Sequence, residues 1–328
     1  MFSFIRKQKH KNNKPLYYLK NFVRYYIPKW ICGKQLPDIL KQLEELDTEE
    51  KTYILKRVNY YNKLEAMTPL DPTRSIQLED FKLQHRKKGN VYFFDTYEYT
   101  RYFPKRYSIV TLFGDITQVP DTPSLTKSRP IAGNNANSVI LKLNKIRHYT
   151  FVKDKKTFTE KKDILIGRAC IKQAQRIRFW EMYFNHPMCD LGQINANNVI
   201  RPEWIKPSIS IDEHLDYKFI LCIEGFDVAS NLKWVMSSNS LAVMPRPKYE
   251  TWFMEGTLIP DYHYVCIKDD YSDLEERLTY YINHPDEAQA IINHAHEYVV
   301  QFRNKKREDL ISLLVLKKYF EKTGQYRD

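Results

Sequence analysis

The sequence predicts an α/β protein with a parallel, Rossmann-like sheet, because short apolar runs alternate with longer helical patterns in its second half. The runs expected to form strands are 163–166, 217–223, 240–244 and 264–267. The first two end in polar turns that contain glycine, as strands often do. Hydrophobic residues make up 43% of the chain, which is enough for a packed core and excludes disorder of the whole chain.

The remaining elements follow from periodicity and composition. Helical patterns are expected over 15–31, 36–66, 170–185, 231–236, 272–283, 286–302 and 306–322. Strand signals cover 91–94 (VYFF) and 107–113 (YSIVTLF). Residues 117–137 are expected to form a loop, because prolines and an Asn-Asn pair interrupt any periodic pattern there.

The excess positive charge, +12 over 328 residues, is concentrated near the N-terminus, where nine basic residues precede the first acidic one, Asp38. Between 15 and 31, apolar side chains recur at helical spacing among basic ones, and Pro28 interrupts the pattern near its end. Two interpretations fit this segment: docking on an anionic membrane surface, or packing on the protein's own core. No signal-peptide pattern and no run of about 20 apolar residues is visible, so we expect a cytoplasmic protein.

Polar residues at strand ends are the candidates for chemistry. The sequence contains no P-loop, HExxH or GxSxG motif. In open α/β sheets, ligands bind at the carboxyl ends of strands, and Asp115, Arg168 and the stretch 224–233 all follow predicted strands. Each has an ordinary alternative, since Asp115 also suits a turn or cap and Arg168 also suits a solvated surface.

A basic chain with 24 tyrosines also suits a module without catalysis that binds nucleic acid or an anionic membrane. Against nucleic acid, the charge excess lies mostly in the first 34 residues, and no RNP, KH or zinc-finger pattern occurs. The charge distribution and the missing motifs therefore disfavour the nucleic-acid interpretation.

Three long segments resemble glycosyltransferase family 90. They are 167–195 (GRACIKQAQRIRFWEMYFNHPMCDLGQIN), 217–244, which contains EGFDVASNLKWVMSSNSLAVM, and 248–267 (KYETWFMEGTLIPDYHYVCI). Upstream, LFGDITQVPDTPSLTKSRPI at 112–131 and NANSVILKLNKIRHY at 135–149 resemble the bacterial branch, which includes lipopolysaccharide-modifying enzymes. The resemblance covers roughly residues 85–325.

The resemblance implies an α/β fold with GT-B architecture, in which two Rossmann-like domains face a cleft, here preceded by the N-terminal amphipathic helical segment. The expected parts are the N-terminal segment 1–35, an acceptor-side domain 36–160, a nucleotide-sugar-binding domain 161–300, and a C-terminal helix 301–328 that packs back on the N-terminal domain. It also implies an inverting hexosyltransferase that uses a UDP-sugar as co-substrate and the core oligosaccharide of lipopolysaccharide or lipooligosaccharide as acceptor. The protein is expected to lie peripherally on the anionic inner face of the cytoplasmic membrane and to have no nucleic-acid partner.

The resemblance implies a donor site built largely in the C-terminal domain. Arg168 matches the family's arginine after a glycine, and the other donor candidates are Gly225, Asp227, Ser230, Asn231, Lys233 and Glu250. Asn231 departs from the family pattern, because eukaryotic members carry arginine there, so Lys233 or backbone N–H groups would contact the diphosphate instead. Glu250 would bind the ribose, its alternative being a surface position on a helix. No cofactor or metal is expected, which agrees with the absence of a DxD triplet.

The resemblance implies an acceptor side that carries the catalytic base. By motif position this base is Asp115, which would take the proton of the acceptor hydroxyl as that hydroxyl attacks the anomeric carbon. Lys127 and Arg129 follow in the same region and would bind phosphates or acidic sugars of the acceptor. Their ordinary alternative is solvated loop charge.

Overall fold

The computed structural model describes residue 10, residues 12–83, 90–195, 197 and 199–326. The chain divides into two compact units. Unit 1 comprises Arg147–Pro247 and Thr257–Gln301 with the described residues up to Asn12, and unit 2 comprises Asn13–Ile146, Lys248–Gly256 and the chain from Phe302 onward. Residues 248–256, which the sequence analysis assigns to the C-terminal domain, thus belong to unit 2.

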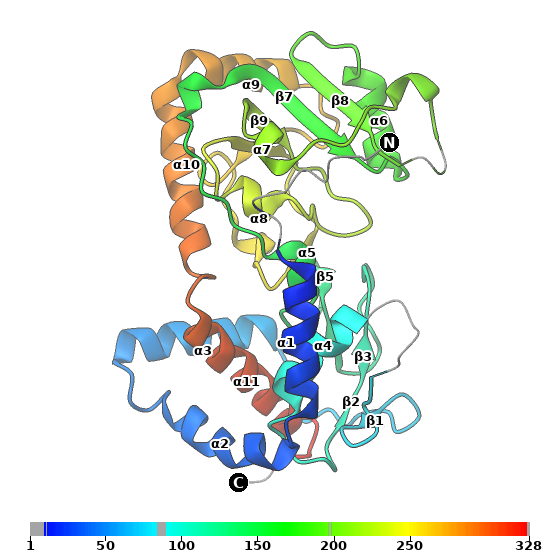
Figure 1. Cartoon of the computed structure of the whole chain (residues 1–328), viewed down its shortest axis with the longest axis vertical. Coiled ribbons are helices and arrows are strands. Elements are labelled where there is room, and N and C mark those ends of the chain that lie inside the picture. Colours follow the sequence, from blue (N-terminus) through cyan, green and yellow to red (C-terminus); the bar gives the residue numbers. More distant parts are fainter. Residues whose placement is uncertain (1–9, 11, 84–89, 196, 198, 327–328) are drawn as a thin grey trace. The chain divides into compact units, whose positions relative to one another are not determined.

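Unit 1 is built on a five-stranded parallel sheet, visible as the green and yellow arrows of Figure 1. Its strands, in spatial order, are β12 (Val265–Cys266), β10 (Leu241–Met244), β9 (Tyr217–Leu221), β7 (Lys162–Ala169) and β8 (Cys189–Gln193). All four predicted strands of the second half are confirmed. The chain runs from β7 outward to β8 and then returns to β9 on the other side, so the strand order reverses between β7 and β9. Such a switch point is where open α/β sheets bind ligands.

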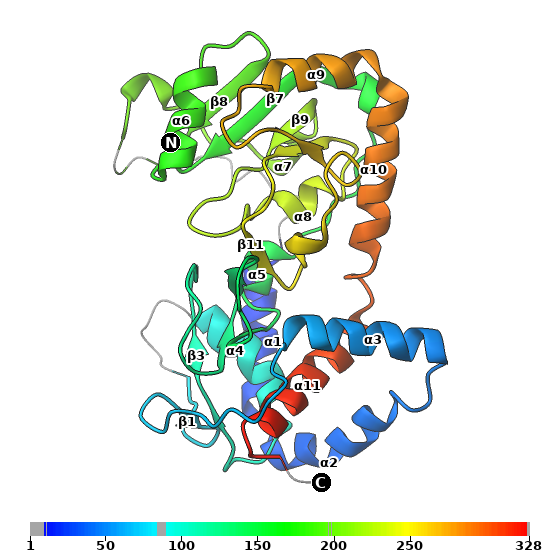
Figure 2. The ribbon, with the colours of Figure 1, turned by 180° about the vertical axis from the view of Figure 1, so that it is seen from behind.

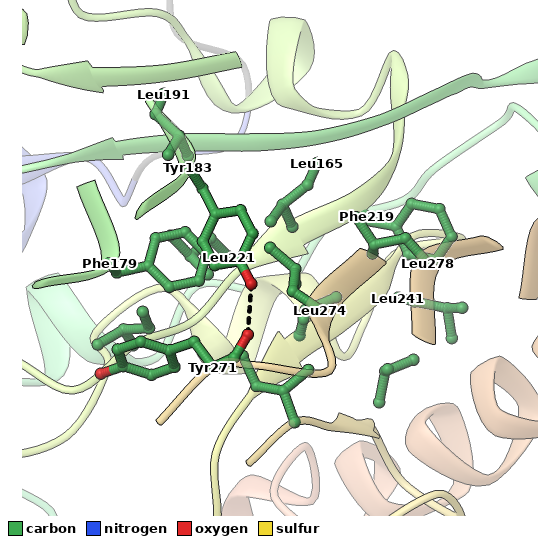
Figure 3. Close-up of a cluster of buried hydrophobic side chains, with 14 of the residues drawn as sticks. Leu165, Phe179, Tyr183, Leu191, Phe219, Leu221, Leu241, Tyr271, Leu274 and Leu278 are labelled. Atoms are coloured by element: carbon green, nitrogen blue, oxygen red, sulfur yellow. Dashed lines mark hydrogen bonds between the residues drawn. The ribbon is translucent and has the colours of Figure 1, made fainter. Parts of the chain in front are cut away.

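Helices cover this sheet. They are α6 (Ala174–Tyr183), α7 (Ile211–His214), α8 (Leu232–Val235), α9 (Leu274–Asn283) and α10 (Pro285–Val300), with 3-10 turns at Phe158–Glu160 and Pro202–Trp204. A third 3-10 turn, Glu255–Thr257, lies at the boundary between the two units in the sequence. Side chains from one face of the sheet, including Leu165 and Phe219, form a buried cluster with Phe179 of α6 and Leu278 of α9 (Figure 3). Tyr183 lies in the same cluster and satisfies its hydroxyl by donating to the Tyr271 carbonyl at 2.5 Å. The polar hydroxyl of this buried tyrosine therefore has a hydrogen-bond partner.

Unit 2 is mainly helical. Its helices are α1 (Lys14–Tyr26), α2 (Lys29–Lys41), α3 (Thr48–Tyr61), α4 (Asn90–Thr100) and α11 (Lys305–Lys322), and α5 (Lys145–His148) starts in it. Its strands are β1 (Ile76–Gln77), β2 (Ser108–Ile109), β3 (Thr111–Leu112), β4 (Ser124–Thr126), β5 (Ser128–Pro130), β6 (Ser138–Ile140) and β11 (Tyr249–Thr251). β3, β4 and β6 form a parallel sheet, whereas β1 pairs with β2 and β5 pairs with β11 in antiparallel fashion.

Capping residues explain where the helices of unit 2 begin. Asn13 accepts a hydrogen bond from the Leu16 amide at 3.0 Å at the start of α1. Asp47 accepts one from the Glu50 amide at 2.8 Å at the start of α3, where two glutamates also complement the helix dipole. The helical pattern predicted over 36–66 is thus confirmed, split between α2 and α3.

Two predictions within unit 2 were wrong. Residues 91–94 were expected to form a strand but lie in α4, most of whose side chains are buried on all sides. A helix buried all round shows no amphipathic period, so its aromatic run resembles a strand. Residues 117–137 were expected to form a loop but contain β4 and β5, whose ladder partners lie elsewhere in the chain.

The C-terminal helix α11 packs against α3 in unit 2, as both views show (Figures 1 and 2). A buried charge network joins them: Glu308 of α11 contacts Arg57 of α3 at 2.6 Å and Lys142 at 2.9 Å, and accepts a hydrogen bond from Trp252 at 2.6 Å. Removing one partner of such a network leaves an uncompensated buried charge, which is strongly destabilising. The network therefore fixes the C-terminal helix within unit 2.

Candidate active site

The segment after β9 carries most of the predicted donor residues and is held by α6. Arg176 donates to the carbonyls of Ile223 at 2.9 Å and Glu224 at 3.1 Å, and Gln175 donates to the Gly225 carbonyl at 2.8 Å. Gly225 lies against the Arg176 guanidinium, and a Cβ there would sit 3.1 Å from it. The loop is thus fixed at the carboxyl end of β9, beside the switch point of the sheet.

The far end of this segment is anchored to β9 itself. Asn231 donates to the Leu221 carbonyl at 2.9 Å, so the residue that departs from the family pattern closes the loop between them. Asp227 and Lys233 are buried, whereas Ser230 is partly exposed. The helix that follows, α8, is a single turn, so its dipole is short and the predicted helix-start contribution rests on local N–H groups.

Arg168 lies within β7, one residue before its end, rather than in a turn after it. Its Nη2 contacts both oxygens of the Asp190 carboxylate of β8, at 2.9 and 3.0 Å, and Nη1 donates to the Asp190 carbonyl at 2.8 Å. Lys206 contacts the same carboxylate at 2.8 Å. Burial raises the pKa of Asp190, but the hydrogen bonds from both cations outweigh it and hold that pKa below its ordinary value. Gly192, the ladder partner of Arg168, leaves the space that the arginine side chain fills.

Asp115 and Lys127 lie at the same edge of the small parallel sheet of unit 2. Asp115 follows β3, Lys127 follows β4, and these strands are neighbours, so their carboxyl ends coincide. The Lys127 ammonium donates to the Asp115 carboxylate at 2.5 Å. The lysine side chain is 2% exposed, whereas that of Asp115 is 37% exposed. Lys127 therefore holds a carboxylate that solvent, or a hydroxyl, can reach.

A second contact fixes the turn that carries Asp115. The Ser128 hydroxyl contacts both the amide and the carbonyl of Ile116, each at 3.2 Å. Gly114, just before Asp115, has a φ of +120°, a region that favours glycine. The geometry of this turn and the buried Lys127 ammonium together therefore fix the position of the Asp115 carboxylate.

Arg129 and Glu250 are ladder partners on β5 and β11 of unit 2. Their side chains form a buried ion pair at 2.8 Å, and Glu250 also accepts a hydrogen bond from the Tyr60 hydroxyl. The Arg129 guanidinium donates further to the carbonyls of Tyr60 and Ser138, at 2.6 and 3.1 Å. Neither residue is exposed, so the solvated alternatives weighed for them do not apply, and Glu250 lies on a strand rather than a helix.

Sequence reasoning missed several residues that build these constellations. Arg176 and Asp190 carry no local motif, and their partners are backbone carbonyls or a residue on a neighbouring strand. Phe226, in the loop after β9, has a side chain that is 60% exposed. Its position within a polar segment after a strand was the signal that could have identified it.

The parallel sheet with its switch point and the polar constellations at strand ends are consistent with a Rossmann-like glycosyltransferase. A family model described as Glycosyl transferase family 90 matches residues 141–320. The chain is also 40% identical over 293 residues to O-glucosyltransferase LpsA from Dichelobacter nodosus, which covers 89% of this chain and 90% of that protein. The chain therefore belongs to glycosyltransferase family 90, and the resemblance described above is confirmed.

Proposed function

We propose that this protein is an inverting, metal-independent hexosyltransferase of GT-B architecture. It moves a hexose from a UDP-sugar to the core oligosaccharide of lipopolysaccharide or lipooligosaccharide, at the inner face of the cytoplasmic membrane. Glucose is the proposed sugar, because the similar protein from Dichelobacter nodosus is an O-glucosyltransferase. The single observation that carries the proposal is a held but reachable carboxylate, Asp115, in a chain that belongs to family 90.

Asp115 is the proposed general base. An inverting transfer needs one group that accepts the proton of the acceptor hydroxyl as this oxygen attacks the anomeric carbon, while the nucleotide diphosphate leaves from the opposite side. The Lys127 ammonium and the contact between the Ser128 hydroxyl and Ile116 fix the Asp115 carboxylate. It therefore loses little conformational freedom when it engages the acceptor hydroxyl. General-base assistance of this kind is worth about 10²–10⁴ in rate.

The donor is proposed to bind at the carboxyl edge of the sheet in unit 1. The support is the switch point between β7 and β9, together with a loop that α6 holds in place through Arg176. Arg168 would supply positive charge to the leaving diphosphate, with Asp190 orienting its guanidinium. Phe226 offers an exposed aromatic face on which a uracil ring can stack. Metal independence stays a proposal that rests on the missing DxD triplet.

Burial changes the roles proposed for Lys127, Arg129 and Glu250. Lys127 is 2% exposed and the other two are almost fully buried, and all three make ion pairs within unit 2. We propose that Lys127 positions the base and that the Arg129–Glu250 pair fixes the strands around it. Because these three residues are buried, we propose that they do not contact acceptor phosphates or ribose directly.

The test is a panel of nucleotide sugars, each incubated with the full chain in EDTA, with and without purified core glycolipid. We expect release of UDP from UDP-glucose to rise strongly when the glycolipid is present, together with a mass increase of one hexose on the glycolipid. No transfer from any UDP-hexose, or transfer that requires added Mg²⁺ or Mn²⁺, would overturn the proposal.

A further inference from the structure

Apolar side chains of α1 and of the start of α2 are exposed to solvent. We define this surface as the apolar stripe; its members are Leu16, Leu19, Val23, Tyr26, Ile27 and Trp30. Their exposed fractions range from 38% to 74%. Residues three or four apart lie on one face of a helix, so the first four form a single row along α1. Ile27 follows the end of α1, and Trp30 lies in the first turn of α2.

The opposite face of α1 is packed against α4 of the same unit. Tyr17 donates to the Asp95 carboxylate at 2.7 Å, and Arg24 contacts Glu98 at 2.6 Å. Tyr25 meets Tyr97 with ring centroids 5.2 Å apart. The core-packing interpretation thus accounts for one face only, and α1 is held firmly enough to present the other.

Charge surrounds the apolar stripe with one sign. Lys20 lies one turn from Leu16 and Val23 on α1 and is exposed, and exposed Lys34 lies over the Trp30 ring, 5.2 Å from its centroid. No acidic residue occurs in the sequence before Asp38, so nothing on α1 opposes this charge. Tyrosine and tryptophan next to lysine are the side chains that sit best at the boundary between lipid tails and headgroups.

We propose that the apolar stripe docks on an anionic lipid bilayer, lying in the headgroup region with its lysines on lipid phosphates. The proposal deepens the proposed function, because it brings the enzyme to a lipid-anchored acceptor, but the observations that carry it involve no sugar chemistry. No helix among the described residues is long and apolar enough to cross a membrane, so an interfacial helix is the form this contact takes.

A second copy of the chain is the competing occupant. The stripe's spacing of three and four residues would also suit a helix pair. Two copies facing each other along α1 would however bring the lysines of that helix together, and α1 carries no acidic residue to offset them, which charge repulsion disfavours. Anionic lipid satisfies both the apolar stripe and the lysines.

The test measures sedimentation of the full chain with phosphatidylcholine vesicles, with and without phosphatidylglycerol. The stripe variant is Leu16→Gln/Leu19→Gln/Val23→Gln, because glutamine preserves helix propensity. Its matched control is Met67→Gln/Val300→Gln, which changes side chains of equal exposure away from α1. We expect the wild type and the control to bind vesicles that contain phosphatidylglycerol, and the stripe variant to bind at least about tenfold more weakly.

The charge variant is Lys20→Gln/Lys34→Gln, with Lys56→Gln/Lys155→Gln as the control at exposed lysines elsewhere. Each lysine near an anionic surface contributes about fivefold to binding, so the charge variant, which lacks two, should bind roughly 25-fold more weakly. Added salt should erase the difference. These lysines are exposed, so this variant remains informative if the stripe variant melts early.

Three results would overturn the docking proposal: equal binding to both vesicle types, unchanged binding of both variants, or a wild-type dimer that the stripe variant dissociates while its vesicle binding stays normal. Transfer to glycolipid dissolved in detergent separates this proposal from the enzymatic one. The stripe variant should retain that transfer. If the wild type transfers no sugar to the dissolved glycolipid, the proposed function is refuted, and the docking result is unaffected.

Discussion

Replacing Asp115 by asparagine separates the chemistry of this residue from its structural role. The asparagine side-chain oxygen can still accept the hydrogen bond that Lys127 donates at 2.5 Å, so the turn after β3 keeps its anchor. Asparagine is also a good turn former. What it cannot do is accept a proton from the acceptor hydroxyl.

The expected loss of turnover is about 10²–10⁴, equivalent to roughly 3–5 kcal/mol on the barrier. Stability should fall less in Asp115→Asn than in Asp115→Ala, because Asp115 is 37% exposed and asparagine keeps a hydrogen-bond acceptor for Lys127. Asp115→Ala removes both the charge and the acceptor from an ammonium that is 2% exposed. That loss should cost about 1–3 kcal/mol, which lowers the melting temperature by about 2–4 °C per kcal/mol.

The assay is turnover at saturating donor and acceptor, alongside a melting curve for each variant. Asp121→Asn is the matched control, since that aspartate lies in the same region with its side chain 91% exposed. We expect the control to behave as the wild type. Near-normal turnover of Asp115→Asn would refute the role of Asp115 as base.

Three further variants test the rest of the account. Arg168→Ala should weaken UDP binding roughly tenfold or more in EDTA, because a hydrogen bond to a charged group is worth about 1.5–3 kcal/mol, whereas Lys206→Ala should not; equal calorimetric affinities would refute this. Glu250→Gln should destabilise the fold by about 3–5 kcal/mol and leave the UDP affinity of the folded protein unchanged, because it breaks a buried ion pair; a selective loss of UDP affinity would restore the ribose role. Burial raises the pKa of Asp95 from 3.8 to about 6, so the folded protein loses stability as pH rises through that window. As pH rises from about 4.5 to 7, the unfolding free energy of Asp95→Asn should therefore increase by about 2 kcal/mol relative to that of the wild type, as measured by urea titrations. A stability difference that does not change with pH would contradict this.

The sheet of unit 1 could be predicted because its signal is local. The central strands β9 and β10 are almost wholly buried, so each appears as an apolar run. The edge strand β8 (CDLGQ) mixes polar and apolar residues and was not predicted. The failure at 91–94 has the same physical origin, since burial on all sides removes the period that distinguishes a helix from a strand.

The candidate site could be predicted in part. Asp115 and the segment 224–233 could be singled out as candidates because they follow strands. The partners of these residues could not be found, because they depend on which strands are neighbours. Lys127 meets Asp115 through the pairing of β3 with β4, and Arg129 meets Glu250 through the pairing of β5 with β11, across 121 residues of sequence. The local composition of 117–137 resembles that of a loop, and it does not indicate with which strands β4 and β5 pair.

The most direct test of the central claim is the anomeric configuration of the product. The full chain is incubated with UDP-α-glucose and core glycolipid in EDTA, and the new linkage is determined by NMR. Transfer with inversion by a single carboxylate base predicts one β-linked glucose. An α-linked product would contradict the mechanism proposed for Asp115, and the absence of any new linkage would contradict the function itself.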